Sequence, residues 1–304
     1  MVKPYWIRRA RILQTTAVLG LVSAGQLKES ALPREYPYRP AFISTISAPP
    51  GHTELVVFPL DGKAFKIPIR SVASVFFGPT GRALYGACTP YPAIGDARLK
   101  MVTCKIDLKT GSTVPVVGST GLHGYYASAV SNNEDRMVFL GVGHLVELTL
   151  PDGKIRTVPL EGAAQYRWTH VSLSPDGERA VAVRNGRLEL IHLSHGITEP
   201  LGDEFFIAEW SPDGKWLAAV EKGDAGRTIL MDATTLTRRR VLGPSELDWS
   251  PDSRYLLGFK SCDAYYGTLE AIDVGTGERT TIQSSKCQVN QATTGWVSSE
   301  IGEE

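Results

Sequence analysis

The sequence contains few residues whose type and spacing are suited to catalysis. The one closely spaced histidine pair is His192 and His195. Residues three apart on a strand face opposite sides, so this pair is not arranged to hold a metal ion. A Gly-x-Ser-x-Gly pentapeptide, which would present the nucleophile of an α/β-hydrolase, does not occur. The sequence therefore predicts no catalytic residue, no metal ligand and no cofactor.

Aromatic and charged residues of the kind that dominate binding surfaces gather in a few long connecting segments. Tyrosine and arginine give a large contact area at a low cost in side-chain entropy, and they are enriched at binding hot spots. The alternative is that the aromatic rings only shield the junctions between loops and core. The candidate partner-binding residues are Tyr91, His123, Tyr125, Tyr126, Tyr166, Arg167, Asp263, Tyr265 and Tyr266.

The elements that must position these residues repeat along the chain. Three segments share a Ser-Pro-Asp turn: Ser174–Gly177, Ser211–Gly214 and Ser250–Ser253. Looser versions begin at Gly78 and Ser131. Proline fixes φ at the first corner of a turn, and aspartate bonds back to the backbone. A β-rich run follows each turn, so each unit is predicted to begin with a hairpin.

A second hairpin follows in each unit, marked for example by 150–154 and 275–277. Four strands in about 40 residues is typical of a β-propeller blade. Five complete units fill 71–284. The remaining pieces, 42–69 and Gly295–Ser298, supply three strands and one strand. We therefore predict an all-β fold: a six-bladed β-propeller of four-stranded antiparallel blades, closed by pairing of the N- and C-terminal strands.

The repeats resemble those of a known family. Trp210–Gly214 and Trp249–Ser253 read Trp-Ser-Pro-Asp followed by a strand, which is similar to the repeats of TolB-like six-bladed propellers. Related repeats occur in the propeller domains of prolyl-oligopeptidase-type peptidases. The resemblance covers 71–260 directly and is specific for fold rather than for function.

The predicted fold indicates where the candidate residues lie. The Ser-Pro-Asp turns occupy one rim of the ring, and the long tyrosine-bearing segments occupy the other. At the predicted starts of the inner strands the sequence reads Tyr126, Trp168 and Phe206, with no recurring ligand. His170 belongs to an inner strand, where it is either a core polar residue or a residue of the central channel.

The four cysteines fall into two pairs that the predicted blades bring together. Cys262 and Cys287 lie in loops of the same rim and would pin the closing segment. Cys88 and Cys104 flank an insertion and form a second candidate pair. The alternative is four unpaired thiols in a reducing compartment.

The N-terminus has the pattern of an export signal. Lys3, Arg8, Arg9 and Arg11 precede a short apolar stretch, and small residues end at Ala24. We predict a signal peptide over 1–24, a linker over 25–39 and the propeller over 40–304. An uncleaved anchor is the alternative. The protein is then periplasmic or secreted, without a membrane span in the mature chain.

Composition narrows the function. The 304 residues carry no net charge, are 42% hydrophobic and include 30 Gly and 19 Pro, which excludes a disordered chain or a coiled coil. No basic excess exists for a nucleic-acid partner. We expect a monomeric, non-catalytic module that binds a protein, a peptide or a glycan. The alternative is a lactonase-like or lyase-like enzyme with its site in the central funnel.

Overall fold

The computed structural model describes most of the propeller region. Its described residues are 32, 36–47, 53–59, 65–69, 72–88, 102–120, 122, 127–160, 168–223, 227–243, 247–263, 266–286 and 293–301. The predicted signal peptide over 1–24 lies outside them. Within the described ranges no helix is long and apolar enough to cross a membrane.

The described strands form six four-stranded antiparallel sheets, here called blades 1 to 6. Blade 1 consists of β24 (Thr293–Ser298), β1 (Tyr38–Ser47), β2 (Thr53–Pro59) and β3 (Phe65–Ile69). Blade 2 consists of β4 (Val72–Phe77), β5 (Ala83–Cys88), β6 (Val102–Asp107) and β7 (Thr113–Pro115). Blade 3 consists of β8 (Ala127–Val130), β9 (Arg136–Leu140), β10 (His144–Thr149) and β11 (Lys154–Pro159).

The remaining three blades repeat the same strand order. Blade 4 consists of β12 (Trp168–Leu173), β13 (Arg179–Arg184), β14 (Arg187–His192) and β15 (Thr198–Gly202). Blade 5 consists of β16 (Phe205–Trp210), β17 (Trp216–Glu221), β18 (Thr228–Asp232) and β19 (Arg238–Gly243). Blade 6 consists of β20 (Asp248–Trp249), β21 (Tyr255–Asp263), β22 (Tyr266–Asp273) and β23 (Arg279–Lys286).

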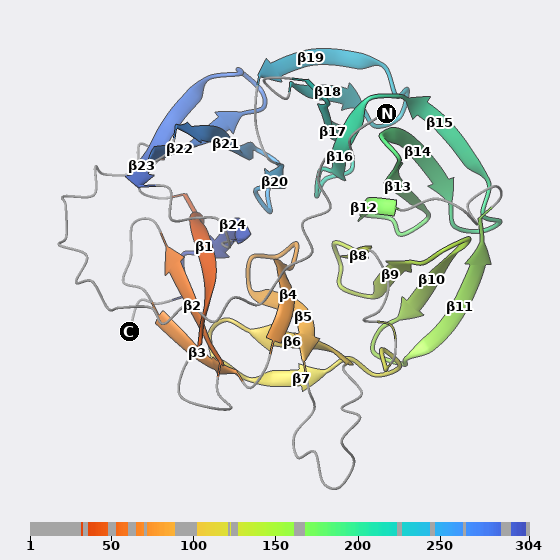
Figure 1. Cartoon of the computed structure of the whole chain (residues 1–304), viewed down its shortest axis with the longest axis horizontal. Helices are drawn as coiled ribbons and strands as arrows, with labels where there is room; N and C mark the ends of the chain where they lie inside the picture. The colour runs from red at the N-terminus through yellow and green to blue at the C-terminus, as the bar shows by residue number, and fades with distance from the viewer. Residues whose placement is uncertain are drawn as a thin grey trace, which may run out of the picture.

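The blades are arranged as a ring around a common centre (Figure 1). The first strand of each sheet lies innermost, and the last lies on the perimeter. The C-terminal strand β24 pairs antiparallel with the N-terminal strand β1, with Trp296 opposite Pro40 and Val297 opposite Arg39. The all-β propeller of four-stranded antiparallel blades is confirmed, and the predicted pairing between the two ends of the chain is present.

The Ser-Pro-Asp turns act as predicted, as self-contained hydrogen-bond units. In blade 4 the Ser174 hydroxyl donates to the Arg179 carbonyl at 2.7 Å and accepts from the Arg179 amide at 2.9 Å. The Asp176 carboxylate accepts from the Glu178 amide at 3.0 Å. Hydrogen bonds from the Ser174 hydroxyl and the Glu178 amide favour the charged form of the Asp176 carboxylate and lower its pKa. The aspartates of these motifs therefore form the turns, as the sequence predicts.

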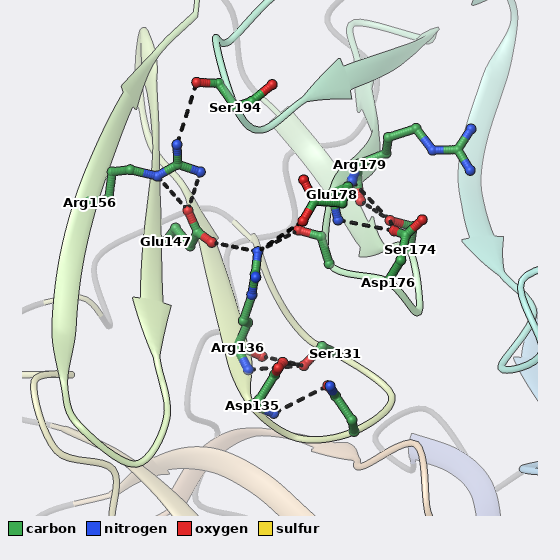
Figure 2. A network of polar contacts seen from close by, with 12 residues as sticks. Ser131, Asp135, Arg136, Glu147, Arg156, Ser174, Asp176, Glu178, Arg179 and Ser194 are labelled. Carbon is green, nitrogen blue, oxygen red and sulfur yellow. Dashed lines mark hydrogen bonds and ion pairs between the residues drawn. The ribbon is translucent and has the colours of Figure 1, made fainter.

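A buried charge network joins blades 3 and 4 beneath this rim (Figure 2). Glu147 of β10 accepts hydrogen bonds from Arg136 at 3.2 Å and from Arg156 at 2.7 Å. Arg136 also reaches across the joint to the Gly177 carbonyl of the next blade at 3.0 Å. A carboxylate buried this deeply needs such partners, because an unpaired charge inside a protein is costly. The network therefore fixes the relative position of two neighbouring turns.

The N-terminal approach to blade 1 differs from the predicted linker. Strand β1 begins at Tyr38, inside the segment 25–39. Leu32 and Tyr36 are buried against Tyr255 and Trp296, at the joint between blades 6 and 1. The Tyr36 hydroxyl donates to the Asp252 carboxylate at 2.6 Å. Aromatic burial explains the difference, because packing the Tyr36 ring against Tyr255 and Trp296 stabilises this segment more than leaving it extended in solvent.

One predicted disulfide is confirmed. Cys88 at the end of β5 is bonded to Cys104 in β6, with a Cα–Cα distance of 5.8 Å. It encloses the insertion between these two strands. Cys262 lies in β21, and Cys287 lies outside the described residues. Their pairing therefore stays a prediction.

Candidate functional site

A cavity of about 220 Å³ lies on the axis of the ring. The innermost strands of all six blades contribute to its wall, together with the turns that follow them. The lining residues that matter below are Phe76, Ala129, His170, Ser172, Glu209, Trp210, Asp248, Trp249, Gly295 and Trp296. The channel is therefore the place where the repeated strands bring side chains from distant parts of the chain together.

Polar residues occupy one arc of this wall. Ser172, Glu209 and Asp248 hold equivalent positions in consecutive blades, since each stands two residues before the serine of a Ser-Pro-Asp turn. The same position is Phe76 in blade 2 and Ala129 in blade 3. In blade 1 it is Gly295, which precedes Trp296 as Asp248 precedes Trp249. We call blades 4 to 6 the polar arc and blades 1 to 3 the apolar arc.

His170 and Glu209 face each other across the joint between blades 4 and 5. The His170 Nε2 atom lies 3.7 Å from the Glu209 Oε1 atom, which is too long for a hydrogen bond. Burial lowers the pKa of His170 to about 4, so the ring is neutral at physiological pH. Burial, and then the Asp248 carboxylate, raise the pKa of Glu209 well above its usual value. The polar arc thus holds a neutral imidazole beside a carboxyl group that resists ionisation.

Three indoles line the same cavity, and one of them is bonded differently. Trp249 Nε1 donates to the Glu209 carbonyl at 3.2 Å, and Trp296 Nε1 donates to the Asp248 carbonyl at 3.0 Å. Each indole therefore ties its own blade to the preceding one. Trp210 is 5% exposed, yet its Nε1 has no hydrogen-bond partner. Its backbone amide instead donates to Ser172 Oγ at 3.0 Å.

The cavity extends toward the Ser-Pro-Asp rim. The turn residues in its lining are Pro79, Asn132, Pro175, Pro212 and Pro251. The Asn132 amide donates to the Pro212 carbonyl, which joins the turns of blades 3 and 5 past the intervening blade. This end of the cavity is therefore lined by proline residues and crossed at one point by the Asn132 side-chain amide.

The predicted tyrosine-bearing rim lies almost entirely outside the described residues. Asp263 and Tyr266 are placed by their backbones, which pair with each other at the end of the β21–β22 hairpin. His170, for which the sequence left two positions open, lines the channel. The predicted residues outside the described ranges are Tyr91, His123, Tyr125, Tyr126, Tyr166, Arg167 and Tyr265.

Sequence reasoning missed Glu209 and Asp248 as channel residues. It examined the predicted starts of the inner strands, whereas these two acids stand near the strand ends, just before a tryptophan. The signal that finds them is the repeat itself: aligning the Ser-Pro-Asp turns places both acids at one position. Within the part of the chain that the structure describes, no group of three His, Cys, Asp or Glu residues is arranged to hold a metal ion.

The fold and the axial cavity define a β-propeller, and comparison with solved structures makes this more specific. No protein-family model matches the sequence, and no curated protein matches it either. TolB from Acinetobacter baumannii superposes with a TM-score of 0.59 at 16% identity, covering 85% of this chain and 66% of that chain. The chain therefore has a TolB-like β-propeller fold.

Two further solved structures share the architecture. A chain of a nidogen/laminin complex superposes with a TM-score of 0.52 at 12% identity, covering 86% of this chain and 97% of that chain. An oligogalacturonate lyase in complex with manganese superposes with a TM-score of 0.50 at 13% identity, covering 81% and 73%. These neighbours include a protein–protein complex and an enzyme, so the likeness is one of fold alone.

Proposed function

We propose that this protein is an exported, monomeric, non-catalytic propeller that binds a protein or peptide partner on the rim opposite its Ser-Pro-Asp turns. The closed six-bladed ring serves as the rigid support for this rim. A glycan is the alternative partner, and the experiment below separates the two.

One observation carries this proposal: blade 6 is longer than blade 5 on that side. Strands β21 and β22 have 9 and 8 residues, whereas their counterparts β17 and β18 have 6 and 5. Strand β23 follows the extension, since Lys286 pairs with Tyr266. The added length therefore projects three hydrogen-bonded strands beyond the rim. Asp263 and Tyr266, two of the candidate binding residues, pair with each other at the end of these strands.

The disulfide supports the exported location. Disulfides persist in the periplasm and outside the cell and are rare in the cytosol. The Cys88–Cys104 bond links β5 to β6. We expect the protein recovered from the extracytoplasmic fraction to begin at Gly25, which intact mass determines directly.

The test of function is affinity capture from the native extracytoplasmic fraction with the full chain as bait. The double variant Tyr265→Ala/Tyr266→Ala should lower partner recovery by about tenfold, as hot-spot tyrosines do. The control is Lys215→Ala, an exposed residue on the opposite rim, which should capture as much as the unaltered chain. Equal recovery by the double variant, at an unchanged melting temperature, contradicts the proposal.

A second treatment of the same fraction identifies the class of partner. Protease digestion of the fraction before capture should abolish recovery, and glycosidase digestion should leave it intact. The reverse result would assign a glycan partner in place of a protein or peptide.

A second candidate function rests on the polar arc of the channel. His170 and Glu209 are acid–base groups with shifted pKa values in a cavity, which is a recurrent property of catalytic sites. An enzyme of the lactonase or lyase kind would use them to move a proton. A panel of lactones and uronate oligosaccharides tests this: turnover that disappears in Glu209→Gln would favour the enzyme.

A further inference from the structure

The channel cavity presents two kinds of wall to a ligand. Its apolar arc contributes Phe76, Ala129 and Gly295, and its polar arc contributes His170 and Glu209. The described residues that line it include no lysine and no arginine. A molecule that fills this space must therefore combine an apolar face with a polar edge. The volume of about 220 Å³ suits one small ring rather than a drug-sized ligand.

Two residues of the wall carry a buried polar atom without a hydrogen-bond partner. Four such side-chain atoms occur among the described residues, and two of them, His170 Nε2 and Trp210 Nε1, belong to residues that line the cavity. At the equivalent positions of the next two blades, Trp249 and Trp296 donate to the backbone of the preceding blade. Trp210 makes no such bond, although it is 5% exposed. Buried polar atoms are nearly always paired, with protein or with a bound molecule, so both atoms indicate a ligand.

The two atoms have opposite requirements. The Trp210 indole N–H can only donate, so its partner must be an acceptor. The His170 ring donates from Nδ1 to the backbone of Ala208, which leaves a lone pair on Nε2, so the partner of Nε2 must be a donor. An ammonium or guanidinium group has no lone pair for the indole, and a carboxylate has no hydrogen for the imidazole. A hydroxyl group both accepts and donates, so hydroxyl groups suit both atoms.

The neighbouring carboxyl group suits the same chemistry. Burial, and then the Asp248 carboxylate, raise the pKa of Glu209, which favours a protonated carboxyl group that can donate as well as accept. Its Oε1 atom lies 3.7 Å from His170 Nε2, too far for a direct hydrogen bond. A hydroxyl oxygen about 2.8 Å from each atom would bridge them, accepting from Glu209 and donating to His170. The gap between the two side chains is therefore of a size that one hydroxyl group fills.

We infer that the channel binds a neutral hexose, with its hydroxyl groups on the polar arc and its carbon–hydrogen face on the apolar arc. The hydroxyl groups bridge Glu209 and His170 and accept from the Trp210 N–H. The ring face packs against aromatic residues such as Phe76, because this contact removes apolar surface from water. The hexose is either a free sugar or the terminal residue of an oligosaccharide.

The test uses titration calorimetry on the full chain. The neutral probes are glucose, galactose and mannose, and the charged probes are glucosamine and glucuronate. We expect at least one neutral hexose to bind with a dissociation constant of about 1 mM or tighter. Both charged sugars should bind about tenfold or more weakly than this hexose, because each would bury a charge without a partner. The affinity for the neutral hexose should change by less than about twofold between about 0.05 and 0.5 M salt, since an uncharged ligand is not screened.

The trisaccharide of the hexose that binds distinguishes the two sources. Affinity for the trisaccharide equal to that for the free hexose assigns the end of a sugar chain. Binding of the free hexose alone assigns a free sugar.

Variants locate the binding in the channel. Trp210→Phe keeps an aromatic ring and removes the N–H, so it should weaken hexose binding by about tenfold. The matched control is Trp216→Phe, in the same blade but outside the lining of the cavity, which should change the affinity by less than about twofold. If Trp210→Phe does not fold, Ala129→Leu gives a second test, because it fills part of the cavity from the apolar arc and should abolish binding.

Several outcomes would overturn the inference. They are no binding of any neutral hexose, tighter binding of a charged sugar, and an unchanged affinity in Trp210→Phe. Binding of acetamide, with no hexose bound, would assign an amide ligand in place of a sugar. Water alone in the cavity of a crystal soaked with the hexose would show that water satisfies both buried atoms.

This inference stands apart from the proposed rim function. Hexose binding needs no partner protein, and partner capture depends on Tyr265 and Tyr266. Normal capture by the tyrosine variant contradicts the rim function and leaves hexose binding untouched. Absence of hexose binding contradicts this inference and leaves capture on the rim untouched. Recovery of the hexose unchanged after incubation with the protein distinguishes binding from catalysis.

Discussion

The two arcs of the channel wall have the same backbone and opposite chemistry. At one repeat position the polar arc has Ser172, Glu209 and Asp248, and the apolar arc has Phe76, Ala129 and Gly295. The apolar arc includes the joint where the two ends of the chain meet. A joint between chain ends lacks a covalent connection, so it depends on close packing. The polar arc lies within continuous chain and can carry charged groups at its centre.

The largest effect is expected from breaking the packing at the joint. Trp296 is 2% exposed, stacks with Tyr255 and meets Tyr36 edge to face. Trp296→Ala should lower the free energy of unfolding by about 3–5 kcal/mol, as for other buried aromatic residues. Urea denaturation measures it. Trp216→Ala, at a half-buried position inside blade 5, is the control and should cost clearly less.

Hydrogen exchange shows where the Trp296→Ala chain opens. Backbone amides of β1 and β24 should lose protection first, because they form the joint. If β16 to β19 lose protection equally early, the two ends of the chain are not the weak point of the ring.

A smaller loss is expected from adding one methyl group in the apolar arc. A Cβ atom at Gly295 would lie 2.0 Å from Phe77 Cδ2, inside the ring of a packed side chain. Gly295→Ala should therefore cost about 1–3 kcal/mol through overpacking. Gly275→Ala, at an exposed turn, should change stability by less than about 0.5 kcal/mol. An unchanged free energy of unfolding in Gly295→Ala would show that the apolar arc has space for a further methyl group.

The smallest effect concerns pH and belongs to the polar arc. Because the folded state raises the pKa of Glu209, its protonated form stabilises the fold at low pH, and this contribution is lost as pH rises through the folded-state pKa. The Glu209→Gln substitution removes this loss of stability at high pH. The variant should therefore be more stable than the unaltered chain at alkaline pH, where Glu209 is ionised. Thermal melts across pH measure the difference.

The same thermal melts at acidic pH test the contribution of His170. Its folded-state pKa of about 4 lies below the usual 6.5, so its contribution is present above pH 6.5 and is lost as pH falls toward 4. His170→Gln should flatten the decline of the melting temperature over this interval. A decline of the same slope in the variant would assign acid sensitivity to other groups.

The repeats predicted the architecture well because each turn has its own local hydrogen bonds. Ser174 and Asp176 satisfy the turn without help from distant residues, so the turn is visible in a short sequence. The Cys88–Cys104 pair could be predicted for a related reason, because both residues border one insertion.

The channel could not be found in this way. Glu209 and Asp248 lie within apolar segments, and their meaning depends on which positions of six strands converge. The proximity of His170 to Glu209 depends on how one blade is rotated against the next, and no local sequence pattern shows this. The docking of Tyr36 was equally hidden, because its partner Asp252 is 216 residues away.

The contact of Tyr36 with Asp252 has a mechanical consequence. Any tension applied to the chain ahead of Leu32 reaches the ring first through the buried Leu32 side chain, the Tyr36 hydrogen bond and the aromatic cluster around them. The load passes next to β1, which is held on both edges, by β24 and by β2. A pull on the N-terminal end of β1 is therefore resisted in shear by the hydrogen bonds to both neighbouring strands. The docked Tyr36 takes up load before the β1–β24 pairing does.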